Sequence, residues 1–196
     1  MEPTNAIEMG VRRSVIGLVL SVVGAGASLA LVMSELQRLK DPGSALFCDV
    51  NPLIGCSDTL QEPVAHLLFG VPNSVVGVGL FGALAAIFAM GAFGVRMPRV
   101  VAWGLLAGTA AGAAMVVFFL SVSIFEYRVL CPYCLVVWAV VLALGVLVWT
   151  WGIDEGVLGA GDRTTSRYAW LLVIALYLVV VLVVVVALSD KIAMVL

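Results

Sequence analysis

The chain has 196 residues, of which 63% are hydrophobic and only 11% charged, and its formal net charge is −2. Soluble domains are about a quarter charged, so this composition excludes a soluble protein. The apolar composition predicts the lipid bilayer as a partner. Because the sequence shows no basic stripe, we expect no nucleic acid among its partners.

Five apolar segments follow a polar start at residues 1–13. At 1.5 Å per residue each can cross a hydrocarbon core of ~30 Å, and in lipid a single segment must be a helix to pair its own backbone groups. The first is longer than the apolar part of a cleaved signal peptide, so we expect it to be retained. The segments are residues 14–34, 75–95, 100–125, 130–151 and 169–188. They predict an all-α integral membrane protein.

A long connection, residues 35–74, joins the first two segments, whereas the loop at residues 152–168 and the other connections are short. The long connection contains two cysteines, Cys48 and Cys56. A long loop in a compact protein is more often functional than incidental. We therefore expect this loop to carry part of the functional site.

The second half of this loop has the pattern of a short amphipathic helix. Ser57 or Asp58 is a plausible N-cap, and Pro63 would break the helix or start a second turn. An apolar stripe follows Ser57 and consists of Leu60, Val64, Leu67 and Leu68. The pattern predicts a helix lying on the membrane surface. It would carry His66, the one histidine of the chain.

Small residues recur at helical spacing in two segments. The third segment has Gly104, Gly108 and Gly112, and the first has the sequence GAGAS at residues 24–28. Small residues let helices approach closely in lipid. We expect these positions to pack within the bundle, with a homodimer face as the alternative.

The fourth segment opens with a Cys-Pro-Tyr-Cys motif at residues 131–134. Cys131 lies where a helix begins, so its thiolate would face unpaired backbone N–H groups and the positive end of the helix dipole. Pro132 suits the first helical turn, where an N–H group is not needed. Cys134 lies one turn deeper, within reach of a lipid-soluble oxidant.

Charged and aromatic residues flank these segments. Glu126 and Arg128 are expected to form an interfacial ion pair of little energetic weight. Trp149 and Trp151, near the far end of the fourth segment, fit an interfacial aromatic belt.

Counting the crossings places all four cysteines on the same side of the membrane. Six of the ten Lys and Arg residues lie on the side of the N-terminus and four on the other. The positive-inside rule then predicts a plasma-membrane protein with a cytoplasmic N-terminus and extracytoplasmic cysteines. Disulfides form and persist in such a compartment.

Three kinds of site are compatible with the four cysteines. A Cys₄ zinc site needs four converging thiolates, and the C-x₇-C spacing of the loop pair suits it poorly. Two structural disulfides are a second interpretation, although a C-x₂-C disulfide is more often catalytic. A dithiol relay is the third and is favoured, because a pair at the membrane interface can pass electrons to an acceptor in the membrane.

Three motifs carry a resemblance to a known family. They are FCDVNPLIGCS at residues 47–57, FGVPNSVVG at 69–77 and CPYC at 131–134. With these motifs in this order, residues 14–151 resemble the vitamin K epoxide reductase (VKOR) family, in its bacterial form that drives disulfide bond formation. The resemblance implies that residues 14–151 form a four-helix bundle around a quinone, with residues 169–196 as a fifth helix and a short outer tail.

The resemblance also implies a route for electrons. Cys48 would meet the thiol of a partner protein, and Cys56 would exchange with Cys131. Cys134 would face the quinone, either menaquinone or ubiquinone, and no metal is expected. The product of this route is a disulfide in the partner.

Further residues are assigned by position. Asn73 matches the family asparagine that can donate a hydrogen bond to a quinone oxygen. Trp138 stands where vertebrate members have a quinone-binding tyrosine, so it either donates its indole N–H or forms an aromatic wall. Ser57 and His66 are accessory positions, and His66 is either a proton donor or merely an interfacial residue.

The expected partner is a separate thioredoxin-like (DsbA-like) protein. Some bacterial members carry a fused thioredoxin-like domain after the fifth helix, whereas this sequence stops eight residues past Leu188. Reduction of a quinone epoxide is an alternative activity. A non-enzymatic membrane protein stabilised by zinc or disulfides is the alternative from another functional class.

Overall fold

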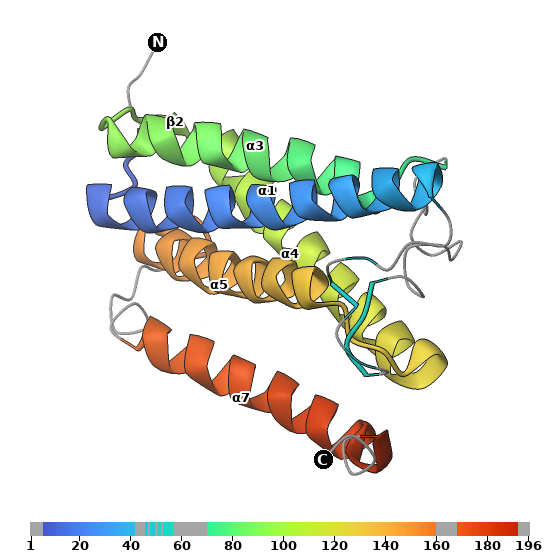
Figure 1. Cartoon of the computed structure of the whole chain (residues 1–196). Coiled ribbons are helices and arrows are strands. Elements are labelled where there is room, and N and C mark those ends of the chain that lie inside the picture. Colours follow the sequence, from blue (N-terminus) through green and yellow to red (C-terminus); the bar gives the residue numbers. More distant parts are fainter. Residues whose placement is uncertain are drawn as a thin grey trace.

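A computed structural model of the chain describes residues 6–41, 46, 48–49, 51, 53–56, 70–159 and 168–191. Four long helices form a bundle, and a fifth lies to one side of it (Figure 1). The elements in order are β1 (Ala6–Ile7), α1 (Val11–Lys40), α3 (Asn73–Ala92), β2 (Met97–Pro98), α4 (Arg99–Val122), the π-helical turn η3 (Ser123–Tyr127), α5 (Pro132–Asp154) and α7 (Ala169–Ala187).

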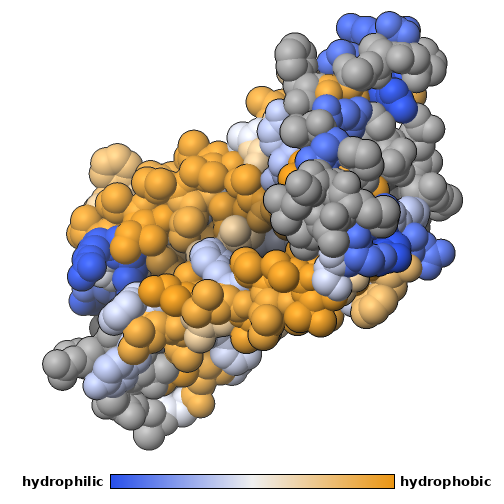
Figure 2. Space-filling view, turned by 60° about the horizontal axis from the view of Figure 1, so that its bottom comes forward, coloured by the Kyte–Doolittle hydropathy of each residue, from blue (hydrophilic) through white to orange (hydrophobic). Residues whose placement is uncertain are grey.

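The five predicted membrane segments are confirmed as helices. Within the described residues, five helices are long and apolar enough to cross a membrane. Apolar side chains cover the middle of the molecule, and hydrophilic ones gather toward its ends (Figure 2). The protein is therefore an all-α, multi-pass membrane protein, as the sequence predicts.

The first helix is longer than predicted. It continues past residue 34 to Lys40, because the sequence ELQRLK contains good helix formers and the first proline comes only at residue 42. The first six residues of the predicted cysteine loop, 35–40, therefore belong to this helix. The connection between α1 and α3 is residues 41–72.

Helices α1 and α3 pack closely through glycines that face phenylalanine rings. A Cβ atom on Gly17 would lie 2.5 Å from the ring of Phe88, and one on Gly24 would lie 2.6 Å from the ring of Phe81. Both rings are buried. The packing expected from the small residues of the first segment is confirmed at Gly24.

The glycine stripe of α4 does not pack as expected. A Cβ atom on Gly104 or Gly108 would have nothing within 4 Å, whereas one on Gly112 would lie 3.1 Å from Val141. The prediction that all three pack within the bundle is wrong for Gly104 and Gly108. The reason is that α4 turns a different face inward, the one formed by Ala102, Leu105, Leu106, Thr109 and Val116.

The main core lies around the second half of α5. Trp151 is 0% exposed, and its indole Nε1 donates to the carbonyl oxygen of Glu8 at 3.3 Å. It is therefore a core residue, and its predicted place in an aromatic belt is wrong, whereas Trp149 is 41% exposed. At the same end of the bundle, Arg13 of α1 pairs with Asp154 of α5.

The fifth helix is attached more loosely than the others. No residue of the most apolar window of α7 is buried. The Tyr177 hydroxyl donates to the carbonyl oxygen of Ala139 on α5 at 2.7 Å. This bond matters because a hydroxyl in the hydrocarbon region has few other hydrogen-bond partners. This hydrogen bond therefore helps to attach α7 to α5.

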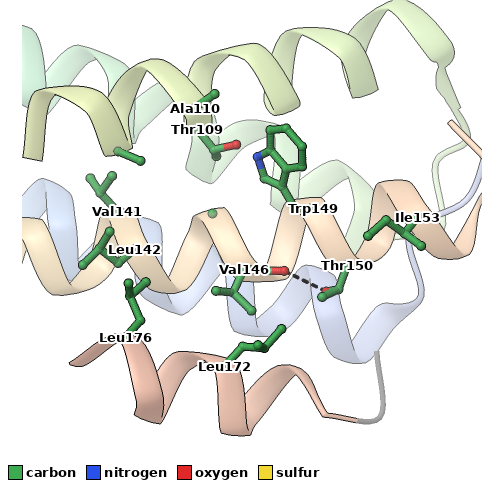
Figure 3. A pocket seen from close by; sticks show the side chains of 12 residues that line it. Thr109, Ala110, Val141, Leu142, Val146, Trp149, Thr150, Ile153, Leu172 and Leu176 are labelled. Carbon is green, nitrogen blue, oxygen red and sulfur yellow. Dashed lines mark hydrogen bonds between the residues drawn. The ribbon is translucent and has the colours of Figure 1, made fainter. Parts of the chain in front are cut away.

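An apolar pocket of about 490 Å³ lies between α4, α5 and α7 (Figure 3). It is lined by residues such as Thr109, Val141, Trp149 and Leu172, and none of the cysteines lines it. On α5, the lining residue nearest to Cys134 in the sequence is Val141, seven residues further on, or about 10 Å along the helix. The pocket is therefore separate from the cysteines.

Candidate functional site

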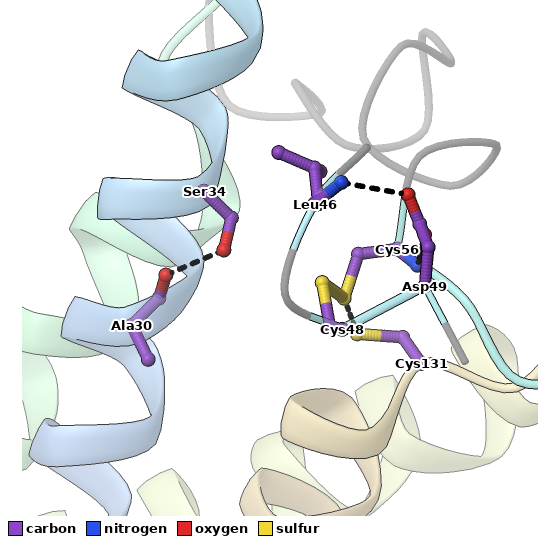
Figure 4. Close-up of a disulfide and its surroundings, with 7 residues drawn as sticks. All are labelled: Ala30, Ser34, Leu46, Cys48, Asp49, Cys56 and Cys131. Atoms are coloured by element: carbon purple, nitrogen blue, oxygen red, sulfur yellow. Dashed lines mark hydrogen bonds between the residues drawn. A yellow bond between two sulfur atoms is a disulfide. The ribbon is translucent and has the colours of Figure 1, made fainter. Parts of the chain in front are cut away.

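The four cysteines come together at one end of the bundle. Cys48 and Cys56 form a disulfide in the connection between α1 and α3, and Cys131 and Cys134 are thiols at the start of α5. The Sγ atoms of Cys56 and Cys131 are 3.3 Å apart (Figure 4). Cys48, Cys56 and Cys131 are 3%, 0% and 2% exposed, and Cys134 is half-buried.

Two polar side chains shape the loop around its disulfide. The carboxylate of Asp49 accepts from the backbone N–H of Cys56 at 2.8 Å and from that of Leu46 at 3.1 Å. The Asn51 Oδ1 accepts from the N–H groups of Leu53 and Ile54 at 2.9 and 2.8 Å. Such turns are typical of Asp and Asn. Neither residue is among those predicted from the sequence, although the Asp and Asn in CDVNPLIGC are a turn signal.

Backbone hydrogen bonds join this loop to the segment before α5. Leu130 N–H donates to the Leu53 carbonyl at 2.9 Å, and Gly55 N–H donates to the Leu130 carbonyl at 3.1 Å. Ile54 and Leu130 thereby form a parallel bridge. Because Cys131 directly follows Leu130, this pairing brings Cys131 to the loop disulfide.

The environment of Cys131 favours its thiolate. Helix α5 begins at Pro132 with Cys131 as N-cap, which confirms the helix start read from the sequence. A hydrogen bond with the side chain of Cys134 lowers the pKa of Cys131, although burial of the thiol opposes this. The positive end of a helix stabilises an anion at this position. Cys131 is therefore suited to nucleophilic attack on the neighbouring disulfide.

Asn73 is the first residue of α3 and is half-buried. The next residue, Ser74, donates to a carboxylate oxygen of Glu35 on α1 at 3.2 Å. One turn before Glu35, Leu31 packs with Cys48, Cys56 and Cys131. The C-terminal end of α1 thus lies against both the start of α3 and the cysteine cluster. The contact between Ser74 and Glu35 could not be predicted from the sequence, because nothing in the chain order shows that they meet.

The remaining predicted positions fall in different places. Trp138 is 7% exposed, one turn past Cys134 on α5. Ser57, His66 and the predicted surface helix lie outside the described residues.

The ion pair expected between Glu126 and Arg128 is not the one that forms. Glu126 is exposed on η3, and the Arg128 guanidinium pairs with Asp190, just past α7. Arg128 has a left-handed backbone, with φ 54° and ψ 33°, which ends the π-helical turn. That change of direction, together with the position of α7, brings Arg128 to Asp190.

A four-thiolate metal site does not fit this arrangement. The Cys48–Cys56 bond leaves two of the four sulfurs unable to act as thiolate ligands. Within the part of the chain that the structure describes, no three His, Cys, Asp or Glu side chains gather as a metal site requires. What the cysteines can do together is thiol–disulfide exchange, since a thiol lies beside a disulfide.

A family model described as the vitamin K epoxide reductase family matches residues 15–149. The match contains all four cysteines, Asn73 and Trp138, and it ends before α7. No curated protein matches the sequence.

Proposed function

Because the chain belongs to the vitamin K epoxide reductase family, and is thus a membrane oxidoreductase, we propose that it is a thiol oxidase that uses a membrane quinone. Electrons would pass from a reduced thioredoxin-like protein to Cys48–Cys56, then to Cys131–Cys134, and then to the quinone. The observation that carries the proposal is the distance of 3.3 Å between the sulfurs of Cys56 and Cys131. Exchange needs two sulfurs from different pairs in contact, and these two are.

The internal step is a balanced exchange between two dithiol pairs. The thiolate of Cys56 attacks the Cys131 sulfur of an oxidised Cys131–Cys134 pair, and Cys134 leaves as a thiolate. Cys48 then attacks Cys56 and releases Cys131, so that one disulfide forms and one is reduced. The observed state, a Cys48–Cys56 disulfide beside two thiols, corresponds to the end of this step.

The first step uses Cys48 as the target of the partner thiolate. Attack there leaves Cys56 as the departing thiolate, next to Cys131. Because Cys48 is only 3% exposed, the loop around it has to open when the partner docks. We propose that the partner is a separate DsbA-like protein. We also propose that the cysteines face the extracytoplasmic side, which the Lys and Arg distribution supports.

A quinone head group is proposed to bind at Cys134. Cys134 is a half-buried thiol at the start of a membrane-spanning helix, so an apolar acceptor can approach it from the lipid. Asn73 has an amide donor at the N-terminus of α3, and the buried Trp138 lies one turn past Cys134. We propose that Asn73 and Trp138 hold the head group beside Cys134. A bound quinone, menaquinone or ubiquinone, supplies an acceptor for two electrons and two protons.

The test of this function is a turnover assay with the full chain in detergent or nanodiscs. Given a reduced thioredoxin-like protein and a quinone, the protein should oxidise the first and reduce the second in equal amounts. Quinone absorbance and thiol titration measure the two halves. A protein that reduces no quinone with any reduced thioredoxin-like donor would contradict the proposal.

The partner half has its own readout. In Cys56→Ser, Cys48 can attack the disulfide of an oxidised partner, but no loop thiol remains to resolve the product. A mixed disulfide at Cys48 should therefore accumulate on non-reducing gels. The matched control Cys48→Ser should give much less of this mixed disulfide. Equal amounts in both variants would show that Cys48 is not the thiol that reacts with the partner.

Asn73 should affect quinone binding rather than thiol exchange. In Asn73→Leu one hydrogen bond of about 1 kcal/mol to the quinone is lost, so KM for quinone should rise roughly five- to tenfold. The exposed neighbour Val75 provides the control, and Val75→Ala should leave this KM unchanged. An unchanged KM in Asn73→Leu would remove Asn73 from the site.

A further inference from the structure

The segment Arg128–Cys131 determines how close Cys131 comes to the loop disulfide. Leu130 is held to Leu53 and Gly55 by two backbone hydrogen bonds, and Cys56 and Cys131 are the next residues along the two paired stretches. A shift of this segment along the loop would separate the two sulfurs. Contacts that fix the backbone at the start of this segment therefore help to keep the sulfur of Cys131 next to that of Cys56.

The start of the segment is a strained residue. Arg128 is the one non-glycine residue with positive φ within the described ranges. Such a conformation is unfavourable for a residue with a side chain and persists only where surrounding contacts hold it. One contact comes from the neighbouring turn, where the Ser123 hydroxyl donates to the Val129 carbonyl at 2.6 Å.

The other contacts come from residues just past the end of α7. Asp190 pairs with the Arg128 guanidinium, and Lys191 Nζ donates to the Arg128 carbonyl oxygen at 3.0 Å. The hydrogen bond from Arg128 lowers the pKa of Asp190, so this carboxylate is charged at neutral pH. Two consecutive residues just past α7 thus hold both the side chain and the backbone of Arg128. We call these three residues the Arg128 clamp.

We infer that the Arg128 clamp positions Cys131 for exchange with Cys56, so that α7, which lies outside the residues matched by the family model, supports the redox relay. Asp190 and Lys191 are positioning residues that act through Arg128. The inference rests on the exchange between Cys56 and Cys131 in the proposed function. Because the Arg128 and Asp190 side chains are 40% and 52% exposed, the pair adds little to global stability, and its effect should appear in the exchange.

The test measures the internal exchange without quinone or partner. In a Cys134→Ala background, Cys131 attacks Cys56, the Cys48–Cys56 bond breaks, and Cys48 takes up the proton that Cys131 loses. Alkylation of Cys48 and a Cys56–Cys131 cross-link report the product. Adding Asp190→Asn with Lys191→Met should lower the rate and the final yield of cross-link about three- to tenfold, at an unchanged melting temperature.

Matched variants separate the clamp from a general effect at this end of α7. The Ser189 hydroxyl donates to the carbonyl oxygen of Val186, and the described structure shows no other bond to it. Ser189→Ala should therefore give the same rate and yield of cross-link as Cys134→Ala alone. Asp190→Glu should restore much of the loss from Asp190→Asn. Arg128→Gln combined with Asp190→Asn should lose no more than either change alone, because both remove the same pair.

The outcomes distinguish the two proposals. Equal cross-linking with and without the clamp residues would overturn the inference and leave the relay standing. A parallel fall in melting temperature and exchange would also overturn it, because the residues would then be merely structural. If no cross-link forms with the clamp intact, the relay itself is wrong and the inference falls with it.

Discussion

Replacing Cys134 with alanine is expected to stop quinone reduction and to accumulate a disulfide between Cys56 and Cys131. Turnover should fall below about 1% of the wild-type rate, because a two-electron exchange needs both thiols of the pair. The cross-link forms because the Cys131 sulfur is 3.3 Å from Cys56 and no Cys134 remains to resolve the mixed disulfide. Quinone absorbance measures the first effect, and peptide mapping under non-reducing conditions measures the second.

The pH dependence of this cross-link follows from the environment of Cys131. The hydrogen bond with Cys134 lowers the pKa of Cys131, so its loss in Cys134→Ala raises that pKa. Fewer thiolates are then present at neutral pH, and cross-linking should speed up as the pH rises toward the new pKa. Cys131→Ala is the matched control and should retain the Cys48–Cys56 disulfide at every pH. Full turnover in Cys134→Ala would contradict the assigned order of the relay.

Gly24→Ala is expected to destabilise the bundle by about 1–3 kcal/mol, the usual effect of overpacking a well-packed contact. The added Cβ atom would lie 2.6 Å from the buried ring of Phe81, so α1 and α3 have to move apart or the ring has to turn. Reversible unfolding in mixed detergent micelles, followed by the loss of helical signal, measures the free energy of unfolding.

The same helix provides the control for this substitution. A Cβ atom on Gly26 has nothing within 4 Å, so Gly26→Ala should be neutral or stabilising by up to about 1 kcal/mol. Phe81→Leu makes room beside residue 24, so the double variant should recover part of the loss of Gly24→Ala. Equal stability of Gly24→Ala and Gly26→Ala would mean that the close contact is not tight in the bilayer protein.

Features that depend on neighbouring residues along the chain could be predicted from the sequence. The start of α5 at Pro132 is one such feature, since proline suits a first helical turn and places Cys131 at its N-cap. The C-terminal end of α1 at Lys40 lies beyond the apolar segment that predicts the helix. The polar sequence ELQRLK extends it, because these residues are also good helix formers. The turns made by Asp49 and Asn51 are equally local and were readable in principle.

Features that depend on which faces of the helices meet could not be predicted in this way. Gly24 and Gly104 have the same kind of small-residue pattern, yet only Gly24 packs against a neighbouring helix. In lipid, a helix that is apolar all around carries no polar stripe to mark its buried side. Sequence spacing therefore indicates that a close contact can form without showing where.

The sequence by itself determined the membrane helices, the family and the gathering of four cysteines on one side, because hydrophobicity, motif spacing and the number of crossings are properties of chain order. Only the tertiary structure decided that Cys56 is the loop sulfur beside Cys131, and that Arg128 pairs with Asp190 rather than Glu126. Both contacts join segments separated by more than sixty residues. Their formation depends on how the loop and α7 lie against the bundle, and that follows from the packing of the whole molecule.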